Sequence, residues 1–240
     1  MLSNVIILTK GLSGSSVLAS LIGRAGYWTG EDTVKKPDYD TFENDVLVAL
    51  NRRLFEDAGY RGKYEMVFDA SDFRLFEEAY GRVDARPYRE FAELCAKNQP
   101  WLWKDPRLWL TIRYWQHIID LRQVKFVCLD REPLQTWIAT TLRRQIQTYE
   151  YCRRYGSSVS DSIRAFVREG GYDAIELVYE QLVTQPESTI GKLNEFLGTN
   201  LSVADLEAVY NQKLYRRPRG LADFARASLI FAKNYAHRYR

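Results

Sequence analysis

The sequence contains few of the residues that build disulfide frameworks or metal centres. Its 240 residues include only three cysteines, Cys95, Cys128 and Cys152, which are odd in number, widely spaced and without a CxxC pair. This pattern argues against both a disulfide framework and a cysteine-based metal site. We therefore expect no bound metal, and three buried thiols in a protein of a reducing compartment.

Long apolar runs and an excess of one charge are also missing. No segment approaches the ~20 apolar residues of a membrane span, and the first apolar segment begins about four residues from Met1, too early for a signal peptide. The chain has 34 basic and 31 acidic residues, a net charge of +3, without the basic excess of a nucleic-acid binder. We expect a soluble cytoplasmic protein that binds neither nucleic acid nor membrane.

What the chain does contain is an alternation of short apolar segments with longer amphipathic ones, without repeats or low-complexity tracts. Strands are predicted at residues 5–9, 65–68, 101–103, 124–129 and 175–179. Helices are predicted at residues 16–25, 41–57, from 107 to about 121, from 133, and at 186–197. Alternating strands and helices predict an α/β fold, a parallel sheet with helices on both faces, in a single domain over residues 1–240.

The residues that follow the predicted strands share a chemical character. Right-handed crossovers place the carboxyl ends of parallel strands along one edge, where ligands of such sheets bind. The segments at these exits are residues 10–16, residues 104–107, Arg131 and Tyr179. Three of the four carry a cation. The sequence therefore predicts an anion site at this edge.

The first exit is a loop, KGLSGSS, at residues 10–16. Gly11 and Gly14 allow backbone angles that aim successive N–H groups inward, and the helix after the loop adds free donors and the positive end of its dipole. No lysine follows Gly14, so the loop does not match the GxxxxGK[ST] pattern of a kinase P-loop. An ordinary turn with a serine cap is the alternative interpretation.

Four stretches together resemble one family. The loop, the segment WKDPR at residues 103–107 and the segment VCLDREP at 127–133 occur in the order and spacing found in sulfotransferases that use 3′-phosphoadenosine 5′-phosphosulfate (PAPS). The segment VYEQLV at 178–183, with Pro-Glu at 186–187 and Phe-Leu-Gly at 196–198, is also similar to that family. The resemblance covers residues 4 to 198.

The resemblance implies a P-loop NTPase-like fold and transfer of a sulfuryl group from PAPS to a hydroxyl or amine of a small-molecule acceptor. The desulfated nucleotide, PAP, is then the second product. The residues that the resemblance assigns to the cofactor are Gly11, Leu12, Ser13, Gly14, Ser15 and Ser16 at the 5′-phosphosulfate, Arg131 and Thr140 (or Thr136) at the 3′-phosphate, Tyr179 near the adenine, and Arg217, Arg219 and Gly220 closing over it.

The chain departs from the family pattern at three positions. Leu12 stands where an Arg or Lys usually contacts the sulfuryl group, and Lys10 is the nearest substitute in sequence. Ala139 stands where a Ser usually joins the 3′-phosphate site. Pro106 stands where some members carry a catalytic His.

For catalysis, Lys104 is the predicted stabiliser of negative charge at the sulfuryl group, with Lys10 as a second candidate. Lys104 paired with Asp105 as a brace for its loop is the alternative. The predicted general base is Glu31, with Asp32 close behind, because similar acidic residues follow the first helix in some members that sulfate tyrosine hydroxyls. The two histidines, at positions 117 and 237, are predicted to be structural or solvated.

Residues 33–64 are expected to form a lid or an acceptor-binding insertion. Two other functions stay open at this point. One is a P-loop kinase of a small metabolite, with Asp69 as an acidic strand end. The other is a PAPS- or PAP-binding protein with weak catalysis, suggested by Leu12. The sequence does not specify the oligomeric state.

Overall fold

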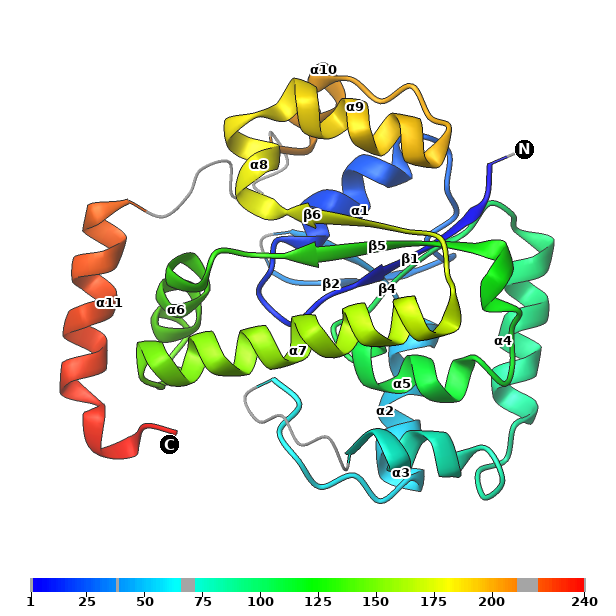
Figure 1. Cartoon of the computed structure of the whole chain (residues 1–240), viewed down its shortest axis with the longest axis horizontal. Helices are drawn as coiled ribbons and strands as arrows, with labels where there is room; N and C mark the ends of the chain where they lie inside the picture. Colours follow the sequence, from blue (N-terminus) through cyan, green and yellow to red (C-terminus); the bar gives the residue numbers. More distant parts are fainter. Residues whose placement is uncertain (1, 38, 66–71, 211–219, 240) are drawn as a thin grey trace.

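The protein was analysed as a computed structural model that describes residues 2–37, 39–65, 72–210 and 220–239. Its centre is a four-stranded sheet in the order β4-β1-β5-β6, with all neighbours parallel (Figure 1). The strands are β1 (Asn4–Leu8), β4 (Leu102–Lys104), β5 (Val124–Asp130) and β6 (Ala174–Val178). A separate antiparallel hairpin consists of β2 (Thr33–Lys35) and β3 (Asp40–Asn44). The predicted α/β fold with a parallel sheet is confirmed.

Eleven α-helices are described. They are α1 (Ser15–Gly23), α2 (Asp45–Asp57), α3 (Asp72–Ala79), α4 (Arg86–Lys97), α5 (Leu108–Trp115), α6 (Pro133–Leu142), α7 (Tyr149–Gly170), α8 (Tyr179–Thr184), α9 (Pro186–Leu197), α10 (Val203–Tyr210) and α11 (Leu221–Lys233). Short 3-10 turns lie at Leu121–Gln123 and Tyr235–His237. Within the described part of the chain, no helix is both long and apolar enough to cross a lipid bilayer.

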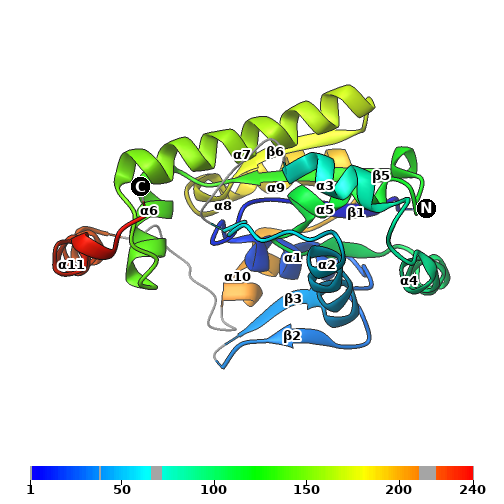
Figure 2. The same ribbon diagram turned by 90° about the horizontal axis from the view of Figure 1, so that it is seen from below.

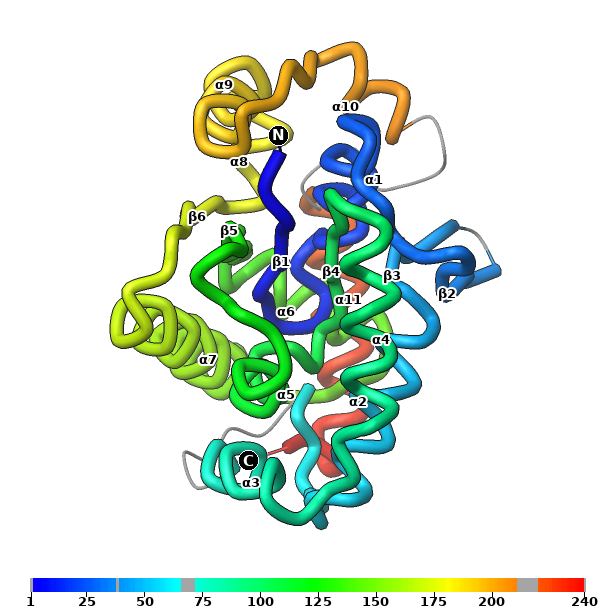
Figure 3. Tube along the Cα trace, turned by 90° about the vertical axis from the view of Figure 1, so that its right-hand side faces the viewer, coloured from blue at the N-terminus to red at the C-terminus, as the bar shows by residue number. Residues whose placement is uncertain are grey.

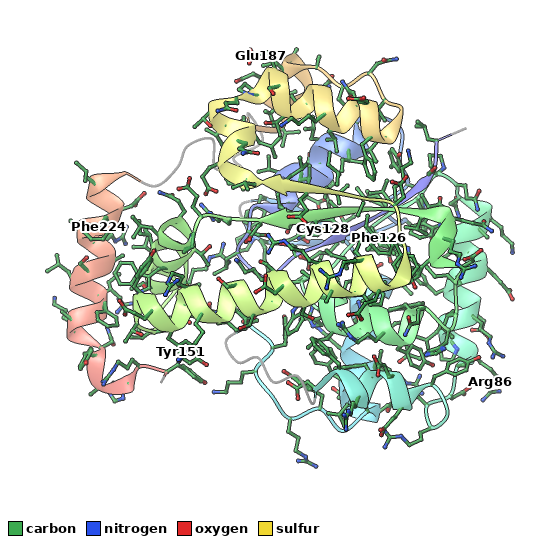
Figure 4. All side chains as sticks on the ribbon, in the orientation of Figure 1. Arg86, Phe126, Cys128, Tyr151, Glu187 and Phe224 are labelled. Carbon is green, nitrogen blue, oxygen red and sulfur yellow. The ribbon has the colours of Figure 1, made fainter. Side chains whose placement is uncertain are left out.

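The sheet is buried on both faces, which explains why β1 reads as an unbroken apolar run. Alternate residues point to opposite sides: Ile6 and Leu8 pack with α2, α4, α5 and α7, and Val5 and Ile7 pack with α1, α9 and α10. Figure 3 looks nearly along the strands and shows these two helical layers above and below the sheet. In Figure 4, Phe126 and Cys128 on β5 lie between them. All three cysteines are free and buried, as predicted.

Several predicted elements differ from the observed ones. The helix predicted over 41–57 begins only at Asp45, because the preceding residues pair in the hairpin and Asn44 Oδ1 accepts a hydrogen bond from the N–H of Leu47 (3.1 Å), capping the helix. The helix predicted to reach residue 121 ends at Trp115. Tyr179 starts α8 instead of ending β6. The strand predicted at 65–68 falls almost wholly outside the described residues.

The hairpin and α2 lie on one side of the molecule, and α7 and β6 on the other (Figure 2). The hairpin packs against α1 and β4. The 22-residue α7, which the sequence analysis does not predict, runs under β5 and packs against α6. The hairpin and α7 both supply walls of the site described below.

Because Ile7 is fully buried at the centre of the sheet, Ile7→Ala is expected to lower the free energy of unfolding by about 2–5 kcal/mol. Denaturant unfolding followed by tryptophan fluorescence measures the change. Leu134→Ala is the control, since that side chain is 43% exposed, and its change should stay within about 0.5 kcal/mol. Equal losses in the two variants would contradict the assigned packing of β1.

Candidate active site

A cavity of about 250 Å³ lies where the four parallel strands end. Its lining includes Lys10 after β1, Lys104 at the end of β4, Arg131 after β5 and Tyr179 after β6. The cavity therefore brings together all four strand exits that the sequence analysis singled out. Its remaining walls come from the hairpin, α2, residues 64–65, the start of α5, α6 and α7.

The loop between β1 and α1 opens the N-terminus of α1 to the cavity. Gly14 is the residue that precedes the helix, it has a left-handed backbone (φ 85°), and no side chain caps the helix. This differs from an ordinary turn with a serine cap. Leu12 is also left-handed (φ 61°), so the chain turns twice within three residues. Backbone N–H groups at such a turn and at an uncapped helix start form an anion-binding site.

Close packing explains why position 14 is a glycine. A Cβ built on Gly14 would lie 2.3 Å from the ring of Tyr179, which is itself buried at the start of α8. The hydroxyl of Thr9 lies 2.6 Å from Ser13 Oγ and 2.8 Å from the carbonyl oxygen of Leu129 on β5. Tyr179 at the start of α8 and Leu129 on β5 therefore both hold the loop in place.

Arg131 connects the loop to α8. Its Nη1 donates to the carbonyl oxygen of Leu12 (2.9 Å) and its Nε to Glu180 Oε1 (3.2 Å). Its guanidinium carbon lies 5.2 Å from the centre of the Tyr179 ring. The guanidinium therefore holds the loop while it lines the cavity.

Lys10 is buried and its charge is paired. Its Nζ lies 2.6 Å from Asp130 Oδ1, and Ser160 donates to the other carboxylate oxygen (2.9 Å). Burial raises the pKa of Asp130, but Lys10, the N–H of Arg131 and Ser160 outweigh it and hold this pKa below its usual value. Lys10, the predicted substitute for the cation missing at Leu12, thus pairs with the Asp130 carboxylate.

Lys104 reaches over the start of α1 to the hairpin. Its Nζ lies 2.5 Å from Glu43 Oε1, 3.2 Å from the carbonyl oxygen of Thr41 and 3.3 Å from Ser16 Oγ. The residue between Thr41 and Glu43, Phe42, has a left-handed backbone (φ 54°), a strained conformation for a bulky side chain. Glu43, the residue after Phe42, lines the cavity.

Asp105 contacts Arg107 and not Lys104. It is fully buried, and its Oδ1 accepts hydrogen bonds from Nη1 (2.9 Å) and the backbone N–H (3.0 Å) of Arg107. Its Oδ2 accepts from Asn51 Nδ2 (2.9 Å), and Asn51 Oδ1 accepts from Trp115 Nε1 (2.9 Å). Burial alone lowers the pKa of Arg107, but the Asp105 carboxylate raises it above its ordinary value, so the guanidinium stays charged.

The described lining of the cavity has seven basic side chains and two acidic ones, an excess of five positive charges. The basic residues are Lys10, Lys36, Arg52, Lys104, Arg107, Arg131 and Arg143, and the acidic ones are Glu43 and Glu65. Asp130, Asp105 and Glu180, which lie outside the described lining, pair with three of these cations, so two positive charges remain uncompensated. A concave site with net positive charge attracts an anionic ligand.

Comparison with known proteins agrees with this arrangement. A model of the sulfotransferase family matches residues 13–203. The chain belongs to the sulfotransferase family. No curated protein matches this sulfotransferase in sequence.

Two solved structures have a similar fold. The sulfotransferase domain of the Synechococcus PCC 7002 olefin synthase is 16% identical, with a TM-score of 0.56 over 95% of this chain and 94% of that one. The sulfotransferase domain from the curacin biosynthetic pathway is 15% identical, with a TM-score of 0.53 over 93% and 82%. At these identities the likeness shows a shared sulfotransferase fold.

The remaining predicted residues of this sulfotransferase are placed as follows. Thr140 and Thr136 line the cavity, and the Thr140 hydroxyl donates to backbone carbonyl oxygens within α6. Gly220 is exposed before α11 and outside the described lining, and positions 217 and 219 are not among the described residues. Glu31 and Asp32 are also exposed and outside that lining.

Sequence reasoning missed Glu43, because it assigned residues 41–44 to a helix. The available signal was Asn44 followed by an acidic residue, a typical helix start that would have left Glu43 outside the helix.

Gly14→Ala is expected to destabilise the protein by about 1–3 kcal/mol, since it strains a left-handed residue and pushes the loop off Tyr179. Gly11→Ala is the matched control, because a Cβ there meets nothing within 4 Å and its backbone is not left-handed. Thermal unfolding of the two variants measures the difference. Indistinguishable stability of the two variants would contradict the loop geometry.

Proposed function

We propose that this sulfotransferase transfers a sulfuryl group from PAPS to a hydroxyl or amine of a small-molecule acceptor and releases PAP. The observation that carries the proposal is the uncapped start of α1, which faces a cavity beside Lys104. The loop residues from Gly11 to Ser16 all line this cavity. Their backbone and hydroxyl donors suit the 5′-phosphosulfate.

The rest of the nucleotide site is proposed along the exits of β5 and β6. Arg131 is the residue for the 3′-phosphate, because its planar guanidinium matches phosphate oxygens and it already lines the cavity. Thr140, on the cavity side of α6, is proposed to assist it. Tyr179 is proposed to pack near the adenine. The excess of positive charge fits a nucleotide with phosphates at both the 3′ and the 5′ positions of its ribose.

PAPS supplies the sulfuryl group when it is bound, and the protein's contribution is positioning and electrostatic stabilisation, as in phosphoryl transfer. Lys104 is proposed to stabilise the negative charge of the sulfuryl oxygens, since its ammonium lies within 3.3 Å of Ser16 at the start of α1. Lys10 is a weaker candidate, because its ammonium is directed to Asp130.

Glu43 is proposed as the general base, in place of Glu31 and Asp32. A base must reach the acceptor's proton, and the Glu43 carboxylate lies in the cavity, 2.5 Å from the Lys104 ammonium. Glu65, the other acidic residue of the lining, is exposed and accepts a hydrogen bond from Gln145 (3.0 Å). We propose that Glu43 takes the proton of the acceptor hydroxyl while Lys104 turns from Glu43 to the sulfuryl group.

Residues 33–64 are proposed as the acceptor wall. The hairpin and α2 contribute Val34, Lys36, Tyr39, Thr41, Glu43 and Arg52 to the cavity. Residue 64, a tyrosine, closes the same side.

Isothermal calorimetry with PAP and with ATP tests the nucleotide assignment. We expect tight binding of PAP and no binding of ATP, because the loop lacks the P-loop lysine that reaches the β- and γ-phosphates. The reverse preference would overturn the proposal in favour of a kinase.

Transfer of labelled sulfate from PAPS to a panel of phenols, alcohols and sugars tests the catalytic residues. Lys104→Ala and Glu43→Gln should each lower turnover by about 10²–10³-fold and leave PAP binding largely intact. Lys125→Ala at the start of β5, which lies outside the described lining, is the control and should keep full turnover. Unchanged turnover in either of the first two variants would remove that residue from the mechanism.

A further inference from the structure

Three basic residues of the cavity have no acidic partner in the part of the chain that the structure describes. Lys36 follows β2, Arg52 is on α2 and Arg143 follows α6. Within the described residues none of them forms an ion pair, and the one side-chain contact of Arg143 is from Nη2 to the hydroxyl of Tyr39, at 3.4 Å. The other four cations of the lining are each paired with a carboxylate. The unpaired charge is therefore concentrated on the walls that the nucleotide loop does not supply.

Arg107, a cation on the same walls, is paired with a carboxylate but is also held in position to bind a ligand. The Arg107 side chain is only 14% exposed, and it is held by Asp105, Asn51 and Trp115 in a buried chain of hydrogen bonds. Its guanidinium carbon lies 5.1 Å from the centre of the Tyr64 ring. Nη1 donates to Asp105, and among the described residues Nε and Nη2 have no acceptor. A guanidinium fixed in this way has donors ready for an oxyanion.

Arg52 and Arg107 come from two segments that a buried hydrogen bond joins. Arg52 is the immediate neighbour of Asn51, which bonds the carboxylate that orients Arg107. Both side chains line the cavity. Because Arg107 is positioned by buried residues and Arg52 is exposed, the pair combines a fixed inner cation with an adaptable outer one.

We infer that the acceptor is itself an anion: a hydroxyl compound whose carboxylate or phosphate group binds to Arg107 and Arg52, with Lys36 and Arg143 at the mouth of the cavity. This inference rests on the proposed function. A negatively charged acceptor is repelled by a donor that carries two phosphates and a sulfate, and unpaired cations on the acceptor walls offset that repulsion. A neutral acceptor is not repelled by the donor and needs no such compensating cations.

Matched pairs of acceptors that differ in charge test the inference. The pairs are 4-hydroxyphenylacetate with 4-hydroxyphenylacetamide, 4-hydroxybutyrate with 4-hydroxybutyramide, and glucose 6-phosphate with glucose. For each compound, kcat/KM for sulfate transfer and the affinity for the PAP complex are measured. The first two pairs report on a carboxylate and the third on a phosphate.

The central comparison uses two adjacent arginines of α2. Arg52 lines the cavity, whereas Arg53 pairs with Asp57 (3.3 Å) outside the described lining. Both side chains are exposed, so neither substitution should disturb folding. Arg107→Gln is a third variant, used only if its thermal unfolding shows that it folds, because it leaves Asp105 without its main partner.

We expect the charged member of at least one pair to be preferred at least about tenfold in wild type. Arg52→Gln should reduce that preference about three- to tenfold through KM, and Arg53→Gln should leave it unchanged. Equal kcat/KM values for the two members of every pair, including no detectable transfer to either member, would overturn the inference. Equal effects of Arg52→Gln and Arg53→Gln would also overturn it. Tight PAP binding without charge preference would overturn this inference alone, and failure to bind PAP would overturn the proposed function as well.

Discussion

Parallel pairing on both sides of β1 determines where the charged residues of this protein meet. β1 is fully buried from Val5 to Leu8, and its register with β4 and β5 sets Ile7 opposite Lys104 and Val127. Since the strands run in the same direction, their last residues reach one edge together. The chain then turns away at each exit into a loop or helix whose polar groups face the same space. A strand that slipped by one residue would send its exit residues to the opposite face of the sheet.

The shared edge places several cations in a confined volume, and paired carboxylates offset their mutual repulsion. Three of these carboxylates come from another element, and Asp105 comes from the same loop as its partner Arg107. Lys10 pairs with Asp130, Lys104 with Glu43, Arg107 with Asp105 and Arg131 with Glu180. All four cations have side chains exposed by 14% or less.

Removing one partner of such a buried pair leaves an uncompensated charge, which costs far more than the pair contributes. Each carboxylate therefore stabilises its cation when no ligand is present. An incoming anion competes with those carboxylates for the same cations. Glu43 differs from the other three because it belongs to the hairpin outside the main sheet, next to a strained residue, Phe42. The proposed mechanism uses this partner, because in it Lys104 turns from Glu43 to the sulfuryl group.

Much of the fold was predictable because its signals are local. The apolar runs of β1 and β5, the glycines of the loop and the proline at the start of α6 each mark an element within a few residues. The β2–β3 hairpin was not predictable, because residues 41–44 do not alternate clearly between apolar and polar side chains and lie directly before a helix. Glu43 was missed for the same reason. The Asp105–Asn51 contact also escaped prediction, since it joins residues 54 positions apart that are neighbours only in the folded chain.

Leu12 stands where the family usually has a cation, and the structure shows what this position does here. Its backbone is left-handed and its carbonyl oxygen accepts a hydrogen bond from Arg131. The hydrogen bond is made by the backbone, so it does not depend on which side chain stands at position 12. Arg131 thus contributes positive charge beside the loop, while Lys104 approaches it from the other side at Ser16. In the proposed mechanism, the charge that a basic residue at position 12 would bring comes instead from Lys104 at the end of β4 and Arg131 after β5.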